Sequence, residues 1–206
     1  MLSCRLAASA AHTLIAGALL LATAASHSGE MQAGPFRFTA PPTFAAVSGP
    51  ALDRLQQSVQ SGAARLAERS GLVDPKAAGD LGAAFFHAFR TSDGRLTLIF
   101  QGMPLAEPPD VDEMLGANRE RVDWGVSSGQ LLRTSAVSRQ QVDGVSCILQ
   151  DIAHSRGARL RNWLCFPPDK PRTQVSMSVI CEAQRDCDQH RAEIATLLRG
   201  IRLRSR

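Results

Sequence analysis

The sequence predicts a single α+β domain in which an antiparallel sheet of about six or seven strands is layered with two or three helices. Two observations carry this prediction. Stretches of alternating apolar and polar residues are joined by short turns, as in β-hairpins, and helical segments lie among them without the regular βαβ repeat of a parallel sheet. The composition is globular, with 44% hydrophobic and 20% charged residues. We expect this domain to occupy residues 35–206.

The clearest hairpin spans residues 83–102. Asp93-Gly94 is a typical two-residue hairpin turn, and a register about this turn pairs Phe89 with Leu98. The other expected strands alternate in the same way or are apolar runs bounded by turn residues: 36–38, 131–139, 144–153, 159–166, 174–181 and 201–203.

Helical periodicity occurs in three segments. Residues 51–69 form an amphipathic pattern with an alanine-rich apolar face, and their polar face is not densely basic, which favours packing on the domain over membrane binding. A second helix is expected over residues 111–124 after Asp110, a good N-cap. A third is expected over residues 188–199, with Gly200 as its C-cap.

The N-terminal segment has the three parts of a secretory signal peptide. Arg5 supplies the positive charge, residues 14–22 form an apolar run, and small residues follow at 23–26. This run is shorter than the about 20 apolar residues of a transmembrane helix, and no later stretch is long and apolar enough. We therefore expect a cleaved signal peptide at residues 1–26, a flexible leader at 27–34, and a periplasmic or secreted mature protein.

The charge is mildly basic and excludes little. The formal net charge is +4, and Arg5 is the only charged residue of the predicted signal peptide. The basic cluster of Arg156, Arg159 and Arg161 is interpreted as solvated surface, with attraction to an anionic partner as the alternative. We expect no nucleic-acid partner, because no binding motif is present and the chain has no Tyr for a stacking platform.

The cysteines indicate two disulfide bonds. Cys4 leaves with the predicted signal peptide, and the four cysteines that remain are an even number in an exported chain. If the two strands that carry Cys147 and Cys165 turn about the loop between them, these residues face each other directly. Cys181 and Cys187 flank a change from strand to helix, which favours a local bridge.

A thiol or metal site is the alternative for the last pair. Cys181, Cys187 and His190 form C-x5-C-x2-H, which is not a standard zinc spacing. The chain also has no C-x-x-C pair of the redox type. We therefore predict no metal ion and no cofactor.

One catalytic pattern is present in the sequence. Gly125–Gly129 matches G-x-S-x-G around Ser127, and Asp151 and His154 follow in the order of α/β-hydrolases. That motif works at a turn from strand to helix, whereas a helix is expected before it here and a strand after it. We therefore predict no catalytic residue, and a hydrolase using Ser127 with His154 stays as the alternative.

The order of elements resembles a known family. Val142–Gly144 leads into a hairpin, a further strand, a helix and the ending Gly200–Leu203, while Phe36–Phe38 is followed shortly by Pro41. About half of the chain thereby resembles the PsbP/Mog1-like superfamily, whose members have a sheet layered with helices. The four cysteines and the helical segment 51–69 depart from that pattern.

The resemblance implies an accessory or binding role and transfers no site residue, because fold analogy does not establish function. We therefore expect an exported binding or accessory protein for a protein or small-molecule partner, more readily than an enzyme.

Overall fold

The computed structural model describes residues 30–70, 85–105 and 107–203. The predicted signal peptide, residues 1–26, lies outside this part of the chain. Within the described residues, strands form a seven-stranded and a three-stranded antiparallel sheet, and four helices accompany them. The α+β prediction is confirmed, and the smaller sheet and one short helix add to it.

The strands are short at the N-terminus and long in the centre: β1 (Glu30–Ala33), β2 (Phe36–Thr39), β3 (Phe44–Ala46), β4 (Phe85–Thr91), β5 (Leu96–Pro104), β6 (Ala136–Val142), β7 (Val145–Ala153), β8 (Arg159–Cys165), β9 (Thr173–Cys181) and β10 (Arg202–Leu203). The helices are α1 (Pro50–Ser70), α3 (Val111–Ser127), α4 (Gln184–Gln189) and α5 (Arg191–Gly200).

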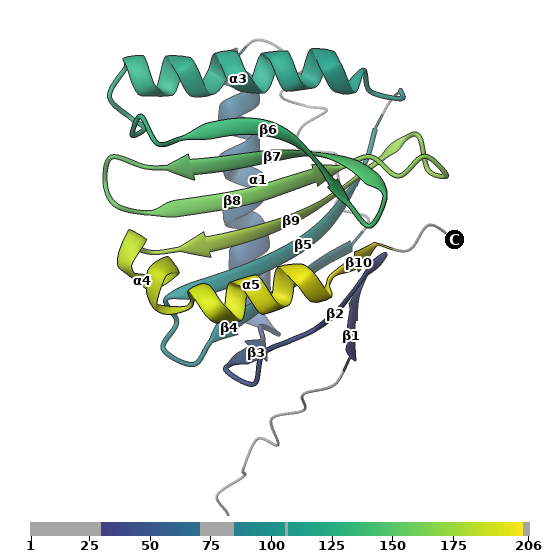
Figure 1. Ribbon diagram of the computed structural model, residues 1–206, viewed down its shortest axis with the longest axis vertical. Coiled ribbons are helices and arrows are strands. Elements are labelled where there is room, and N and C mark those ends of the chain that lie inside the picture. The colour runs from purple at the N-terminus through teal and green to yellow at the C-terminus, as the bar shows by residue number, and fades with distance from the viewer. Residues whose placement is uncertain (1–29, 71–84, 106, 204–206) are drawn as a thin grey trace, which may run out of the picture.

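The large sheet has the strand order β3-β4-β5-β9-β8-β7-β6, and the small sheet has the order β1-β2-β10. Helix α5 lies over one face of the large sheet, and α1 crosses behind it (Figure 1). Helix α3 packs on β6 and β7. We call the face that carries Cys147, Trp163 and Met177 the α5 face, and the opposite one the α3 face.

An aromatic cluster joins the two sheets. Phe36 and Phe38 of β2 both contact Phe100 of β5, with ring centroids 5.2 and 4.6 Å apart. Phe89 of β4 packs edge-on against Phe38 at 5.3 Å. All four side chains are buried, so the small sheet is held mainly by burial of apolar surface. Ile194 and Leu197 of α5 belong to the same core.

Residues 30–33 correct the prediction of a leader. They form β1, pair with β2 from Glu30 opposite Thr39 to Ala33 opposite Phe36, and bury Ala33 completely. Gly34 has a φ of 59° at the turn between the strands, a conformation that glycine adopts without steric cost. A strand of four residues with two polar side chains has too little alternation to be read from sequence.

The predicted strand over 131–139 also begins later than expected. Leu131 makes only an isolated bridge with His154, Ser135 closes a turn by donating its N–H to the carbonyl of Leu132, and β6 starts at Ala136. The predicted pairing of residues 89 and 98 in the first hairpin is confirmed.

The turn between β6 and β7 links the two sheets. Asp143 and Gly144 have φ values of 50° and 78°, as a type I′ hairpin turn requires at both central positions. The Asp143 carboxylate accepts a hydrogen bond of 3.1 Å from the backbone N–H of Leu203 in β10. This bond ties the last strand of the chain to the hairpin.

We predict that Phe100→Ala lowers the free energy of unfolding by about 3–5 kcal/mol, because it leaves a cavity in the aromatic cluster that joins the sheets. The measurement is urea unfolding followed by circular dichroism. Trp124→Ala is the control, since 62% of that side chain is exposed, and its effect should stay within about 0.5 kcal/mol. Equal effects of the two variants would show that the cluster is not central to stability.

Candidate functional site

A cleft opens between α5 and strands β8 and β9 on the α5 face. Its volume is about 340 Å³. Its floor is apolar, with Val179 of β9 and Ile194 of α5, and arginines line its sides. The charged and polar lining residues are Arg159, Arg161, Gln184, Asp188 and Arg191.

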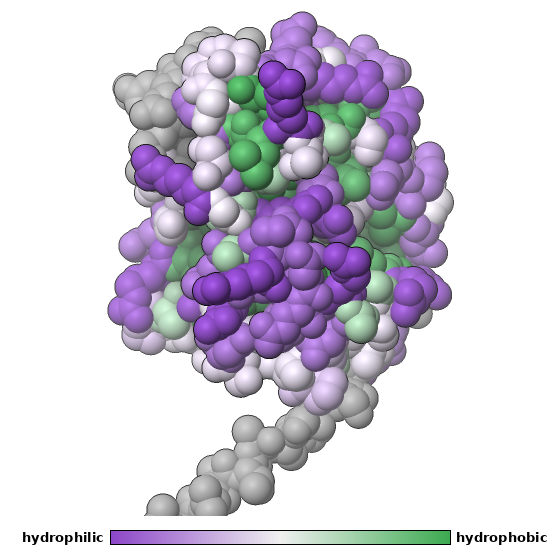
Figure 2. All heavy atoms as spheres, turned by 60° about the vertical axis from the view of Figure 1, so that its left-hand side comes forward, coloured by the Kyte–Doolittle hydropathy of each residue, from purple (hydrophilic) through white to green (hydrophobic). Residues whose placement is uncertain are grey.

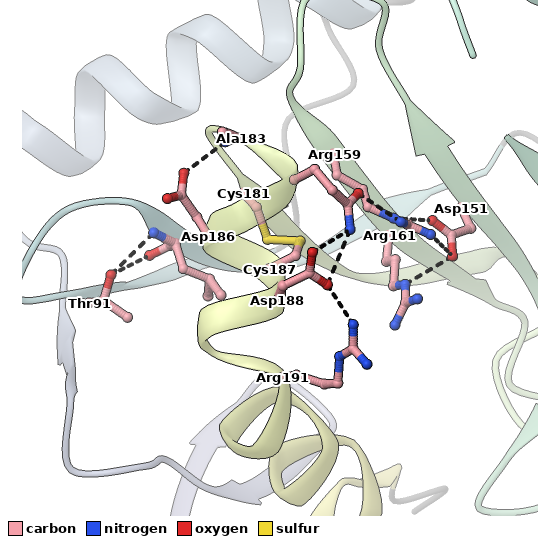
Figure 3. The surroundings of a disulfide bond; sticks show 12 residues. Thr91, Asp151, Arg159, Arg161, Cys181, Ala183, Asp186, Cys187, Asp188 and Arg191 are labelled. Atoms are coloured by element: carbon pink, nitrogen blue, oxygen red, sulfur yellow. Dashed lines mark hydrogen bonds and ion pairs between the residues drawn. A yellow bond between two sulfur atoms is a disulfide. The ribbon is translucent and has the colours of Figure 1, made fainter. Parts of the chain in front are cut away.

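The register of β7 and β8 places two arginines of β8, Arg159 and Arg161, in the cleft. Asp151 lies directly opposite Arg161, and Arg159 is two positions further along the same face. The Nε atoms of Arg159 and Arg161 lie 2.8 and 3.0 Å from the two carboxylate oxygens of Asp151. Figure 3 shows this carboxylate between the two guanidinium groups.

The two arginines differ in how many of their donors are used. Arg159 also donates to the second oxygen of Asp151 at 3.0 Å and to Gln184 Oε1 at 2.8 Å, and its hydrogen bonds with Asp151 raise its pKa. Arg161 uses only Nε, and its terminal nitrogens have no hydrogen-bond partner among the described residues. Arg159 is therefore a structural tie, whereas Arg161 has donors left for a ligand.

Arg191 at the start of α5 supplies another cation to the cleft. One of its terminal nitrogens lies 2.6 Å from Asp188 of α4, and its side chain is 78% exposed. The hydrogen bond from Arg191 is the main cause that lowers the pKa of Asp188. Three guanidinium groups and the carboxylate of Asp188 line the cleft. The carboxylate of Asp151 pairs with two of these arginines, so the five groups together leave an excess of positive charge.

Helix α4 lies at one end of the cleft and is held there by a disulfide bond and by the buried carboxylate of Asp186. The Cys181–Cys187 disulfide ties it to the end of β9, with a Cα–Cα distance of 5.6 Å. Asp186, whose side chain is 3% exposed, accepts a hydrogen bond of 2.8 Å from the N–H of Ala183 and lies 3.6 Å from Arg95. The helix thus holds Gln184 and Asp188 in the cleft wall, and Figure 3 shows Asp188 between the disulfide and Arg191.

The surface on the α4 side is largely hydrophilic, with hydrophobic residues between the charged ones (Figure 2). A second cavity of about 290 Å³ lies further along α5. It shares Leu198 with the first and has Trp163 and Met177 in its lining, with Gln140 of β6 at one side.

A histidine lies at the junction of α4 and α5 and is engaged by carboxylates. His190 Nδ1 is 2.8 Å from Glu193, and its Nε2 is 3.6 Å from Asp93 in the turn between β4 and β5. The hydrogen bond to Glu193 is the main cause that raises the pKa of His190, and Asp93 adds to it while burial opposes it. Thr43 also donates to Glu193 at 3.1 Å, so this cluster joins α5 to two loops.

The disulfides form the pairs that the sequence predicted. Cys147 lies opposite Cys165 in the β7–β8 ladder and is bonded to it, and Cys181 is bonded to Cys187. The thiol and metal alternative loses its ligands, because disulfide sulfurs are not thiolates. His190, its third member, is engaged by carboxylates.

The hydrolase residues are not assembled into a triad. Ser127 is the last residue of α3 and donates its hydroxyl to the carbonyl of Trp124 at 2.9 Å. Asp151 is occupied by the two arginines of β8. No hydrogen bond joins Ser127 to His154 in the part of the chain that is described.

The basic cluster of the sequence contributes two of its arginines, Arg159 and Arg161, to the cleft. The sequence favours solvated surface for Arg156, Arg159 and Arg161, yet the register that pairs Cys147 with Cys165 also pairs Asp151 with Arg161. Extending the register by four residues would have given this ion pair. Arg191 and Leu198 could not be assigned to the cleft from the sequence. They lie on α5, and only the tertiary structure brings this helix against β8 and β9.

Comparison with known proteins gives little. No protein-family model matches the chain, and no curated protein matches its sequence. The solution structure of cyanobacterial PsbP (CyanoP) from Synechocystis sp. PCC 6803 is similar over 82% of this chain and 87% of that chain, at 8% identity and a TM-score of 0.45. This likeness concerns the fold alone and is too low to transfer a residue or an activity. None of the described helices is both long and apolar enough for a membrane span.

We predict that His190 makes stability depend on pH near neutrality. Because its pKa is raised in the folded protein, its contribution is full below the unfolded value of about 6.5 and is lost as the pH rises through the folded value. Urea unfolding measured from pH 5.5 to 9 should show the decline, and His190→Gln should flatten it. The control His154→Gln changes an exposed histidine and should keep the decline; an unchanged profile in His190→Gln would contradict the assignment.

Proposed function

We propose that this chain is an exported, non-enzymatic binding or accessory protein that holds an anionic group of its partner in the cleft between α5 and β8. The observation that carries the proposal is Arg161. Its terminal nitrogens have no partner among the described residues, and it stands in the cleft with Arg191 above an apolar floor. A guanidinium with available donors is well suited to a carboxylate or a phosphate.

The chemistry of the lining favours binding over catalysis. An arginine keeps its proton at any physiological pH, so it stabilises negative charge but does not act as an acid or base. The carboxylates of the cleft, Asp151 and Asp188, are paired with arginines, and Cys187 is bonded to Cys181. The lining of this cleft therefore supplies neither a poised general base nor a thiolate.

Export is supported by two independent features. Residues 1–26 have the pattern of a signal peptide, and the two disulfides of the domain are of the kind that persists in oxidising compartments.

We predict that protein recovered from the exported fraction begins near residues 25–27 and has no free thiol. Non-reducing peptide mapping by mass spectrometry reads both properties in one measurement. An intact N-terminus starting at Met1 would contradict export, and free thiols at Cys181 or Cys187 would contradict the oxidised state.

We predict that Arg161→Gln weakens binding of inorganic phosphate about tenfold, as expected from the loss of a charge-assisted hydrogen bond. The measurement is a phosphate titration followed by NMR of the arginine Nε–H groups at constant ionic strength. A protein with both Arg54→Gln and Arg119→Gln is the control, because these exposed arginines lie on α1 and α3. Equal weakening in the control would mean that the net charge, and not the cleft, binds phosphate.

Asp151→Asn should have the opposite effect on phosphate binding at the same site. It removes the negative charge beside Arg161 while keeping the shape of the side chain, so phosphate should bind more tightly. Weaker binding in Asp151→Asn would indicate that the ion pair is needed to position Arg161. The unfolding midpoint of each variant shows whether the fold is retained.

A further inference from the structure

The two cavities beside α5 are parts of one groove. They share Leu198, and their floors continue along the same strands. On β8 the lining passes from Arg161 to Trp163, and on β9 from Val179 to Met177. Residues two apart on one face of a strand are separated by about 7 Å, so a single ligand of modest size reaches both cavities.

The ends of the groove differ in chemistry. The first end has the available donors of Arg161. At the second end, Arg202 of β10 donates from one terminal nitrogen to the carbonyls of Arg199 and Ile201, at 3.0 and 2.9 Å. Arg199 of α5 donates to the hydroxyl of Thr196 at 3.3 Å. Beside these arginines, the second end adds the apolar side chains of Trp163, Met177 and Leu198.

An amide group lies beside the apolar end. The indole N–H of Trp163 donates to Gln140 Oε1 at 3.2 Å. The amide nitrogen of Gln140 has no partner within the described residues and can donate to a ligand carbonyl.

We propose that the groove binds an extended peptide segment of a partner protein, with an acidic side chain at Arg161 and an apolar side chain two positions along at Trp163 and Leu198. In an extended peptide, side chains two apart point to the same side and are about 7 Å apart, which matches the spacing of the two ends. The charge of the groove complements the acidic residue, and Gln140 can bind a backbone carbonyl. The inference rests on the proposed function, in that the carboxylate takes the anion position.

The test uses Trp163 as the reporter. The chain has two tryptophans, so Trp124→Phe leaves Trp163 as the only one, at the apolar end of the groove. The probe is the blocked peptide acetyl-Gly-Glu-Gly-Leu-Gly-amide, titrated while the emission of Trp163 is followed. We expect a shift of the emission, and binding about tenfold weaker when Glu is replaced by Gln or Leu by Ala.

Spacing and site are tested with matched reagents. A peptide with one more glycine between Glu and Leu should bind more weakly than the original, because its two side chains point to opposite sides. Arg161→Gln in the Trp124→Phe protein should remove the preference for Glu over Gln, while the pair Arg54→Gln and Arg119→Gln should keep it. NMR of the same samples locates the bound peptide and shows that each variant is folded.

The outcomes separate this proposal from the one on which it rests. Binding of phosphate at Arg161 with no binding of the peptide overturns the peptide and leaves anion binding standing. Binding of the peptide without dependence on Leu or on spacing overturns the shared groove. Binding of decanoate in place of the peptide, with a shift of Trp163 emission, identifies an amphiphilic acid as the occupant and also overturns the proposal. If neither phosphate nor peptide binds, both proposals fail.

Discussion

The antiparallel register of β7 and β8 is the constraint on which the rest of the structure depends. Directly opposed residues share a face of the sheet, so the register that joins Cys147 to Cys165 also sets Asp151 against Arg161. A slip of one residue would move these side chains and Trp163 to the opposite face. The disulfide fastens this hairpin covalently, and it therefore fixes the position of the cleft as well as contributing to stability.

The same register organises the α3 face by different chemistry. Gln150 and Asn162 lie opposite each other and join a row of side-chain hydrogen bonds that runs from Asn118 of α3 to Ser178 of β9. The distances along this row are 2.6, 3.0 and 3.0 Å. Buried polar groups that satisfy one another add specificity to packing, so α3 is positioned by hydrogen bonds as well as by its small apolar cluster.

The two arginines of β8 make different hydrogen bonds in the cleft. Arg159 and Arg161 share a carboxylate, yet one uses its donors on three acceptor atoms and the other uses a single donor. Asp151 therefore has two effects. It holds the β8 arginines in place, and it offsets part of the positive charge that an anionic ligand would meet. The sheet fixes the cation, and the short helix α4, tied by its disulfide, fixes the wall around it.

Features that depend on neighbouring residues could be predicted from the sequence. The first hairpin follows from Asp93-Gly94, and the start of α3 follows from Asp110, whose carboxylate accepts the N–H groups of Asp112 and Glu113. The disulfide pairs were accessible for the same reason, since one lies across a hairpin and the other spans a separation of six residues. A turn or cap is decided within a few residues, where steric and hydrogen-bonding preferences act directly.

The sequence by itself thus determined the α+β class, the main hairpins and the covalent links. Only the tertiary structure decided that Phe36 pairs with Leu203, which closes the small sheet across 167 positions of the chain. It alone brought Leu198 of α5 over Trp163 and so made one groove from two elements. The physical reason is that strand alternation shows which face of a strand is buried, whereas the identity of what covers that face depends on contacts between distant segments, which leave no local pattern.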